Sequence, residues 1–152
     1  MAANTQSARL STREQETATR PSSPAPLVLV AEDHEGTRFL LRYMLEARGY
    51  RVAEAENGED AVALAERIRP DLVMMDGSMP RLDGLEATRR MRQPSFPFRV
   101  PVVFLSGHAE EAARAAAREA GCDDYLTKPF EVKQLEQILR RHVGGGSGSY
   151  GV

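Results

Sequence analysis

Short apolar segments alternate with segments of helical periodicity along most of this chain. One of them, Leu72–Met75, is apolar at every position and is followed at once by Asp76 and a glycine-proline turn. A strand without a polar side is buried on both faces, which is typical of a central strand in a parallel sheet covered by helices. Regular alternation of such strands with helices predicts an α/β fold.

The apolar patterns predict where each strand and helix lies. The expected strands are Leu27–Ala31, Arg51–Ala55, Leu72–Met75, Val100–Leu105 and Asp124–Leu126. The expected helices are Thr37–Arg48, a helix over Ala61–Ile68 that Pro70 ends, Gly84–Arg92, Ala109–Ala120 and Val132–Val143. In the last helix, Val132, Leu135, Ile138 and Leu139 are expected to be buried.

Right-handed crossovers between parallel strands are the common solution for this alternation. Two doubly wound strand orders satisfy the pattern. The short chain favours the flavodoxin-like order 2-1-3-4-5, with a sheet of five parallel strands and five helices.

Composition limits the compartment and the class of partner. With 152 residues, the chain is expected to form one domain, and its net charge of −2 without a basic stripe argues against nucleic-acid binding. The single cysteine, Cys122, fits a reducing compartment. No apolar stretch reaches the length of a membrane span, and the N-terminus lacks the apolar centre of a signal peptide. We therefore expect a cytoplasmic protein without a membrane partner.

The two ends of the chain differ in composition from its middle. Residues 1–26 are rich in small and polar residues and predict a disordered leader. Residues 144–152 (GGGSGSYGV) predict a flexible Gly/Ser tail. The folded domain is expected over residues 27–143.

Functional side chains follow the expected strands where each strand ends. Glu32 and Asp33 follow the first strand, Asp76 the third, Ser106 the fourth, and Lys128 the fifth. In open α/β sheets, ligands bind at the carboxyl ends of the strands. Each residue alone also has an ordinary explanation as a turn-capping acid, a strand-end serine or a solvated lysine. All of them in this order favour a binding site.

The residue types at these positions suit phosphoryl transfer. Asp33 and Asp76 would repel each other on adjacent strands unless a cation lies between them, and Mg²⁺ prefers such oxygen ligands. With the metal bound, Asp76 stays ionised and can attack a phosphoryl group as a nucleophile. Lys128 could carry charge on the phosphoryl oxygens, and Ser106 could hydrogen-bond one of them.

Four segments together resemble the receiver domain of two-component response regulators. They are VLVAEDHEGTR, VMMDGSMPRLDG, VVFLSG and DDYLTKPF, which span nearly all of residues 27–143. The resemblance implies that Asp76 is the phospho-accepting aspartate and that Asp33 binds Mg²⁺ directly. It also implies that Glu32 acts through water and that Ser78 gives its backbone carbonyl to the metal.

The same resemblance implies a conformational switch. Lys128 would bind the phosphoryl group, and its peptide bond to Pro129 is usually cis in this family. Ser106 would be the switch hydroxyl, and Tyr125 the aromatic residue that turns inward when the hydroxyl is drawn to the phosphate.

Two positions set the phosphate lifetime in such proteins. They are the residue two after the acceptor, Ser78, and the residue two after the hydroxyl, His108. We expect His108, near the mouth of the site, to tune hydrolysis of the acyl phosphate, although both residues could simply be exposed loop positions.

We expect the chain to be a stand-alone receiver. A histidine kinase or phosphotransfer protein would donate phosphate to Asp76, and a downstream protein target would be contacted through the face of the fourth helix, fifth strand and fifth helix. The resemblance also allows a homodimer through that face. The protein would be a switch with self-catalysed chemistry and not an enzyme acting on a free metabolite.

Three alternatives remain at this point. The chain could be a phosphate shuttle in a phosphorelay, or a scaffold of the same fold that is not phosphorylated. A hydrolase of the haloacid dehalogenase type is disfavoured, because that class needs an aspartate where Ser78 stands.

Other candidate residues have plainer interpretations. His34 and His142 are expected to be solvated or to cap helices. Phe96 and Phe98 are expected to pack over the sheet edge, with a partner contact as the alternative.

Overall fold

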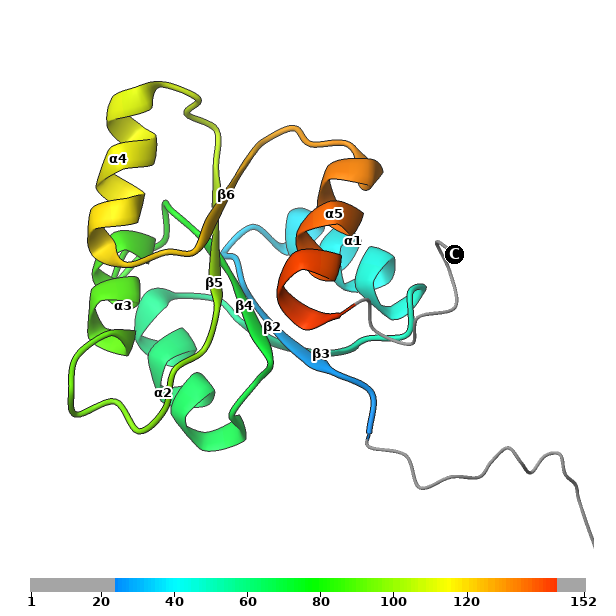
Figure 1. The fold of residues 1–152 in the computed structure, drawn as a ribbon, viewed down its shortest axis with the longest axis horizontal. Coiled ribbons are helices and arrows are strands. Elements are labelled where there is room, and N and C mark those ends of the chain that lie inside the picture. The colour runs from blue at the N-terminus through cyan, green and yellow to red at the C-terminus, as the bar shows by residue number, and fades with distance from the viewer. Residues whose placement is uncertain (1–23, 145–152) are drawn as a thin grey trace, which may run out of the picture.

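Five parallel strands form one sheet in the order β3-β2-β4-β5-β6, which is the expected order 2-1-3-4-5 (Figure 1). The strands are β2 (Leu27–Ala31), β3 (Arg51–Ala55), β4 (Leu72–Asp76), β5 (Val102–Ser106) and β6 (Asp124–Thr127). The helices are α1 (Glu35–Glu46), α2 (Gly58–Ile68), α3 (Gly84–Met91), α4 (Glu111–Ala120) and α5 (Val132–Val143). The computed structural model describes residues 24–144.

Helices cover both faces of the sheet. Figure 1 shows α2, α3 and α4 on one face and α1 and α5 on the other. The first layer buries small side chains such as Ala65 and Ala117 against alternate strand residues. The second layer buries larger side chains, including Leu41 and Leu139. Successive side chains of a strand point alternately into the two cores. This is why β4 is buried at every position.

Several boundaries differ by one or two residues from the sequence predictions. α1 begins at Glu35, because the His34 side chain accepts a hydrogen bond from the Thr37 backbone N–H and caps the helix. β5 begins at Val102 rather than at Val100, since Pro101 has no N–H for the strand ladder. α4 begins at Glu111, two residues later than expected.

One core prediction was wrong, and one loop prediction is confirmed. Val132 is 42% exposed, because it is the first residue of α5 and precedes the turns that reach the sheet. Phe96 and Phe98 pack together at 5.1 Å between ring centroids and lie against the core. The Arg69 guanidinium lies 4.4 Å from the Phe98 ring centroid. The two aromatic rings and this arginine therefore hold the loop against the domain.

Residues 1–23 and 145–152 hold most of the expected leader and tail, and they lie outside the described residues. Within residues 24–144, no helix combines the length and apolarity needed to cross a bilayer.

Candidate functional site

Three carboxylates meet at the carboxyl ends of β2 and β4. The two strands are neighbours in parallel register, with Ala31 opposite Met75, so the residues that follow them emerge together. Carboxylate oxygens of Glu32, Asp33 and Asp76 all lie within 4.8 Å of one another. Glu32 and Asp76 are buried, at 2% and 4% exposure, whereas Asp33 is exposed.

The Lys128 ammonium joins the two buried carboxylates. Its Nζ lies 2.7 Å from Oδ1 of Asp76 and 3.2 Å from Oε1 of Glu32. Burial alone would lower the pKa of Lys128, but the hydrogen bond and charge of Asp76, together with Glu32, outweigh burial and raise that pKa. Lys128 therefore stays protonated and supplies a fixed positive charge. The expected cis bond between Lys128 and Pro129 is present.

The position of Asp76 depends on a close approach between α3 and the end of β4. The Gly84 N–H donates to the carbonyl of Gly77 at 3.1 Å. A Cβ at Gly84 would lie 2.3 Å from the Asp76 carbonyl oxygen, so a side chain there would displace the backbone that carries the carboxylate. On the other side, the Gly77 N–H donates to the carbonyl of Leu105 at 2.9 Å.

The loop after β5 forms the opposite wall. Ser106 is buried, and its hydroxyl accepts a hydrogen bond from the His108 backbone N–H at 3.0 Å. The Tyr125 hydroxyl donates to the carbonyl of His108 at 2.6 Å, and its ring stacks on Phe104 with 5.9 Å between centroids. The two expected switch residues are thus connected through His108.

Arg114 of α4 packs its guanidinium on the ring of Tyr125. The residue was not among those predicted from the sequence. Its guanidinium lies 4.8 Å from the Tyr125 ring centroid and donates to Thr127 Oγ1 at 3.2 Å. It therefore connects α4 to β6 beside the loop of Ser106. Nothing in the alanine-rich sequence of α4 distinguishes this arginine from the exposed Arg118.

All the predicted site residues border one cleft of about 620 Å³. They are Glu32, Asp33, Asp76, Ser78, Ser106, His108, Tyr125 and Lys128. Ser78 is exposed, and the His108 side chain is 74% exposed at 3.6 Å from Oε2 of Glu110. The prediction that strand-end residues converge is confirmed, whereas their individual roles stay predictions.

The donor set fits a small hard cation. Three carboxylates face one ammonium, so two negative charges remain uncompensated at the floor of the cleft. A divalent cation with oxygen ligands would neutralise them, and few carboxylates plus water is the coordination that Mg²⁺ prefers. The acidic residues present can therefore hold the metal that the sequence predicts.

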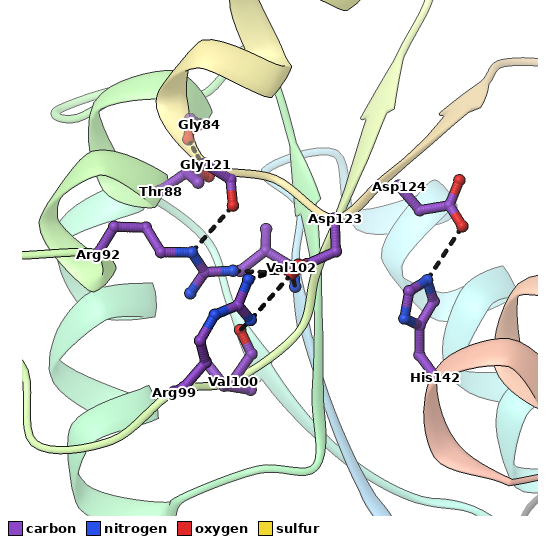
Figure 2. A network of polar contacts seen from close by, with 10 residues as sticks. All are labelled: Gly84, Thr88, Arg92, Arg99, Val100, Val102, Gly121, Asp123, Asp124 and His142. Atoms are coloured by element: carbon purple, nitrogen blue, oxygen red, sulfur yellow. Dashed lines mark hydrogen bonds and ion pairs between the residues drawn. The ribbon is translucent and has the colours of Figure 1, made fainter.

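A second polar network lies at the amino ends of β5 and β6, away from the cleft (Figure 2). The Asp123 carboxylate accepts hydrogen bonds from Arg92, from Arg99 and from the backbone N–H of Val102, at 2.8, 2.6 and 2.8 Å. Burial alone would raise the pKa of Asp123, but these hydrogen bonds and the two arginine charges outweigh burial and lower that pKa. The network ties α3 to the start of β5.

His142 has a mostly buried side chain that is paired with a carboxylate. Its Nε2 lies 3.0 Å from Oδ2 of Asp124 and its side chain is 15% exposed, so the expectation of a solvated or capping histidine was wrong (Figure 2). Arg141 contacts the same carboxylate. The pair fastens the end of α5 to the first residue of β6, far from the acidic cleft.

Comparison with known proteins shows which family the chain resembles. The family model of the response regulator receiver domain matches residues 28–140. The chain is 40% identical over 118 residues to the alkaline phosphatase synthesis transcriptional regulatory protein PhoP of Bacillus subtilis, covering 75% of this chain and 48% of that protein. It is 35% identical over 118 residues to protein PilH of Pseudomonas aeruginosa, covering 78% of this chain and 98% of PilH.

A solved structure matches the fold. It is the receiver domain of a sensor histidine kinase from Pseudomonas aeruginosa PAO1, with a magnesium ion coordinated in its active-site cleft. The TM-score is 0.72 at 39% identity, over 78% of this chain and 98% of that one. The present chain spans about half the length of the transcriptional regulators it matches, at 48% to 53% of each.

Proposed function

The chain belongs to the response regulator receiver domain family, and on that premise we propose that Asp76 accepts a phosphoryl group from a histidine kinase or a phosphotransfer protein. The observation that carries the proposal is the contact of Asp76 with Lys128 at 2.7 Å, beside two further carboxylates within 4.8 Å. A buried carboxylate kept next to a protonated amine is ready to act as a nucleophile.

The transfer forms one bond and breaks another. An oxygen of Asp76 attacks phosphorus, and the bond between phosphorus and the donor nitrogen breaks with its electron pair staying on that nitrogen. The donor ring, protonated on its other nitrogen, leaves as neutral imidazole. A Mg²⁺ ion held by Asp33, Asp76 and the Ser78 carbonyl, with Glu32 reached through water, would neutralise charge on the phosphoryl oxygens when bound. Lys128 would move its hydrogen bond from the Asp76 carboxylate to a phosphoryl oxygen.

The change at Asp76 would reach the surface through Ser106 and Tyr125. The hydroxyl of Ser106 would turn towards a phosphoryl oxygen, which removes its bond with the His108 N–H and so affects the Tyr125 contact on the same residue. Arg114 would carry the change to α4. We therefore propose that the face of α4, β6 and α5 contacts a downstream protein target or a second copy of the chain.

This proposal describes a switch whose only chemistry is its own phosphorylation and dephosphorylation. The relatives place the receiver domain in transcriptional regulators, in PilH and in a sensor kinase, so the context of this chain within a whole protein is itself part of the proposal. A cytoplasmic location is supported by the free thiol of Cys122.

The test is phosphorylation by acetyl phosphate with Mg²⁺, followed by intact-protein mass spectrometry. The native chain should gain the mass of one phosphoryl group, and the gain should disappear in EDTA and in the Asp76→Asn variant. Asp83→Asn is the matched control, because asparagine also caps helices and should preserve α3. Equal incorporation in the native chain and in Asp76→Asn, or none in either, would refute the proposal.

A further inference from the structure

Arg38 of α1 is largely buried beside the acidic cleft. Its side chain is 11% exposed and meets acceptors from two different strand ends. Nη1 donates to the backbone carbonyl of Glu32 at 2.9 Å, and Nε donates to Oε1 of Glu54 at 2.9 Å. Nη2 lies 3.6 Å from Oε2 of Glu56. The guanidinium therefore connects the loop after β2 with β3 and the residue that follows it.

The contact with Glu32 acts directly on the metal site. The carbonyl of Glu32 and the N–H of Asp33 belong to the same planar peptide unit. The N–H of Glu32 donates to the Ala55 carbonyl at 3.0 Å, so Glu32 is fixed on one side by β3 and on the other by Arg38. Holding this peptide plane fixes the direction in which the chain leaves towards Asp33.

Asp33 needs such support more than the other two carboxylates. Glu32 and Asp76 are buried and both contact Lys128, whereas Asp33 is exposed. The same peptide plane that Arg38 holds leads into the backbone of Asp33. The orientation of the exposed carboxylate therefore depends on the backbone from which it projects.

We propose that Arg38 is a positioning residue of the divalent-cation site. By holding the Glu32 carbonyl, it keeps Asp33 directed towards Asp76 and thereby sets the affinity for Mg²⁺. The inference rests on the metal site of the proposed function, but it is tested by metal binding itself and does not require phosphorylation.

Arg42 provides a matched control on the same helix. Its Nη1 lies 3.1 Å from Oε2 of Glu54, so it shares a carboxylate partner with Arg38 and carries the same charge. The bond to Glu32 belongs to Arg38. Loss of a positive charge alone would strengthen cation binding in either variant. A loss of affinity confined to Arg38 therefore reports positioning and not charge.

The experiment is isothermal titration of the full chain with Mg²⁺. We expect Arg38→Gln to bind Mg²⁺ about tenfold more weakly, as is typical when a residue that orients a metal ligand is removed. Arg42→Gln should bind Mg²⁺ within about twofold of the native chain. Removing its positive charge would by itself strengthen cation binding slightly, so it cannot produce the loss of affinity expected for Arg38→Gln. Arg38→Lys should recover only part of the affinity, since one ammonium cannot bridge Glu32 and Glu54 as a guanidinium does.

A second readout separates positioning from general damage. Acetyl phosphate labelling of Arg38→Gln should need more Mg²⁺ for half-maximal rate but should reach the native rate at saturating metal. If Arg38→Gln does not fold by circular dichroism, Arg38→Lys is compared with Arg42→Lys in the same titration. Equal affinities for the two arginine variants, or native affinity in Arg38→Gln, would overturn the inference. Failure of the native chain to be labelled despite Mg²⁺ binding would refute only the proposed function.

Discussion

At the scale of single residues, function and stability oppose each other in the acidic cleft. Glu32, Asp33 and Asp76 present like charges within 4.8 Å of one another, and their mutual repulsion raises the electrostatic energy of the metal-free fold. We predict that Asp33→Asn is at least as stable as the native chain in EDTA, with a gain of up to about 1 kcal/mol from the removed repulsion. Urea denaturation followed by circular dichroism measures the free energy of unfolding.

The same variant should lose its response to magnesium. A ligand that binds only the folded state stabilises it by about 2.7 kcal/mol at one hundred times its dissociation constant. We expect the native chain to show a gain of this kind on addition of Mg²⁺ and Asp33→Asn to show little. An equal gain in both proteins would mean that Asp33 is not a metal ligand.

His108 is the residue for which the structure sharpens a sequence hypothesis. Its backbone is fixed by Ser106 and Tyr125, whereas its side chain is 74% exposed at the rim of the cleft. An exposed imidazole can orient the attacking water only loosely. Its effect on the hydrolysis rate should therefore be far below the 10²–10⁴-fold contribution of a positioned general base. We predict that His108→Ala slows hydrolysis of phospho-Asp76 by a factor of about 2 to 10. The readout is the half-life of the phosphoprotein after removal of acetyl phosphate, and an unchanged half-life would remove the role.

Sequence reasoning found the residues whose chemistry is visible in their type and place. Asp76 and Lys128 each stand where an expected strand ends, so the parallel sheet places both at the same edge. Gly84 and Arg38 were missed for a physical reason. Gly84 matters because a Cβ there would lie 2.3 Å from the Asp76 carbonyl oxygen, and Arg38 matters because it binds one backbone carbonyl. Neither property follows from residue type or periodicity.

At the scale of elements, Asp123 acts as a junction between a helix, a loop and a strand. Its carboxylate accepts hydrogen bonds from Arg92 at the end of α3, from Arg99 and from Val102 of β5 (Figure 2). Removing the charge with Asp123→Asn should destabilise the fold by about 2 kcal/mol at pH 7, the usual contribution of hydrogen bonds to a charged group.

The pH dependence of that loss follows from the lowered pKa of Asp123. The carboxyl holds its proton less tightly in the folded chain than in the unfolded chain. Its stabilisation is therefore fully present above the ordinary value of 3.8 and is lost as the pH falls through the lower folded value. The difference between the native chain and Asp123→Asn should therefore shrink as the pH is lowered from about 5 to below 3.8 in urea titrations. A difference that stays constant over this range would contradict the assignment.

Element positions were predicted better than element ends. The apolar patterns located each helix and strand because burial on a sheet imposes periodicity. The ends depended on single local interactions, such as the His34 cap of α1 and the proline before β5. Val132 was misplaced in the core for a related reason, since periodicity does not show where a helix first reaches the sheet.

At the scale of the whole molecule, the sheet separates two helical layers, and the cleft lies beside α3 and α4, which contribute Leu85, Ala113 and Ala116 to its lining. α1 and α5 lie on one face, and α2, α3 and α4 lie on the other (Figure 1). Tyr125 and Arg114 connect the cleft to α4, which belongs to the proposed output face of α4, β6 and α5. We expect the phosphoryl donor to approach from the side of α1, which is not itself part of that output face.

The exposed surface of α1 supports an approach of the donor from that side. Phe39, Leu40 and Tyr43 are 56%, 53% and 64% exposed, and α1 starts two residues after Asp33. Exposed apolar clusters of this kind often mark protein contacts. A protein donor would bury them on reaching Asp76, whereas acetyl phosphate would not touch them.

We predict that Leu40→Ser lowers the rate of phosphotransfer from a cognate phosphotransfer protein by about tenfold, the effect of losing roughly 1.4 kcal/mol of contact. Labelling by acetyl phosphate should stay at the native rate, because the cleft is untouched. Ala112→Ser, at an exposed position of α4 on the opposite face, should change neither rate. Equal loss with both donors would place the defect in the cleft, and native transfer from the protein donor would show that α1 is not the side of approach.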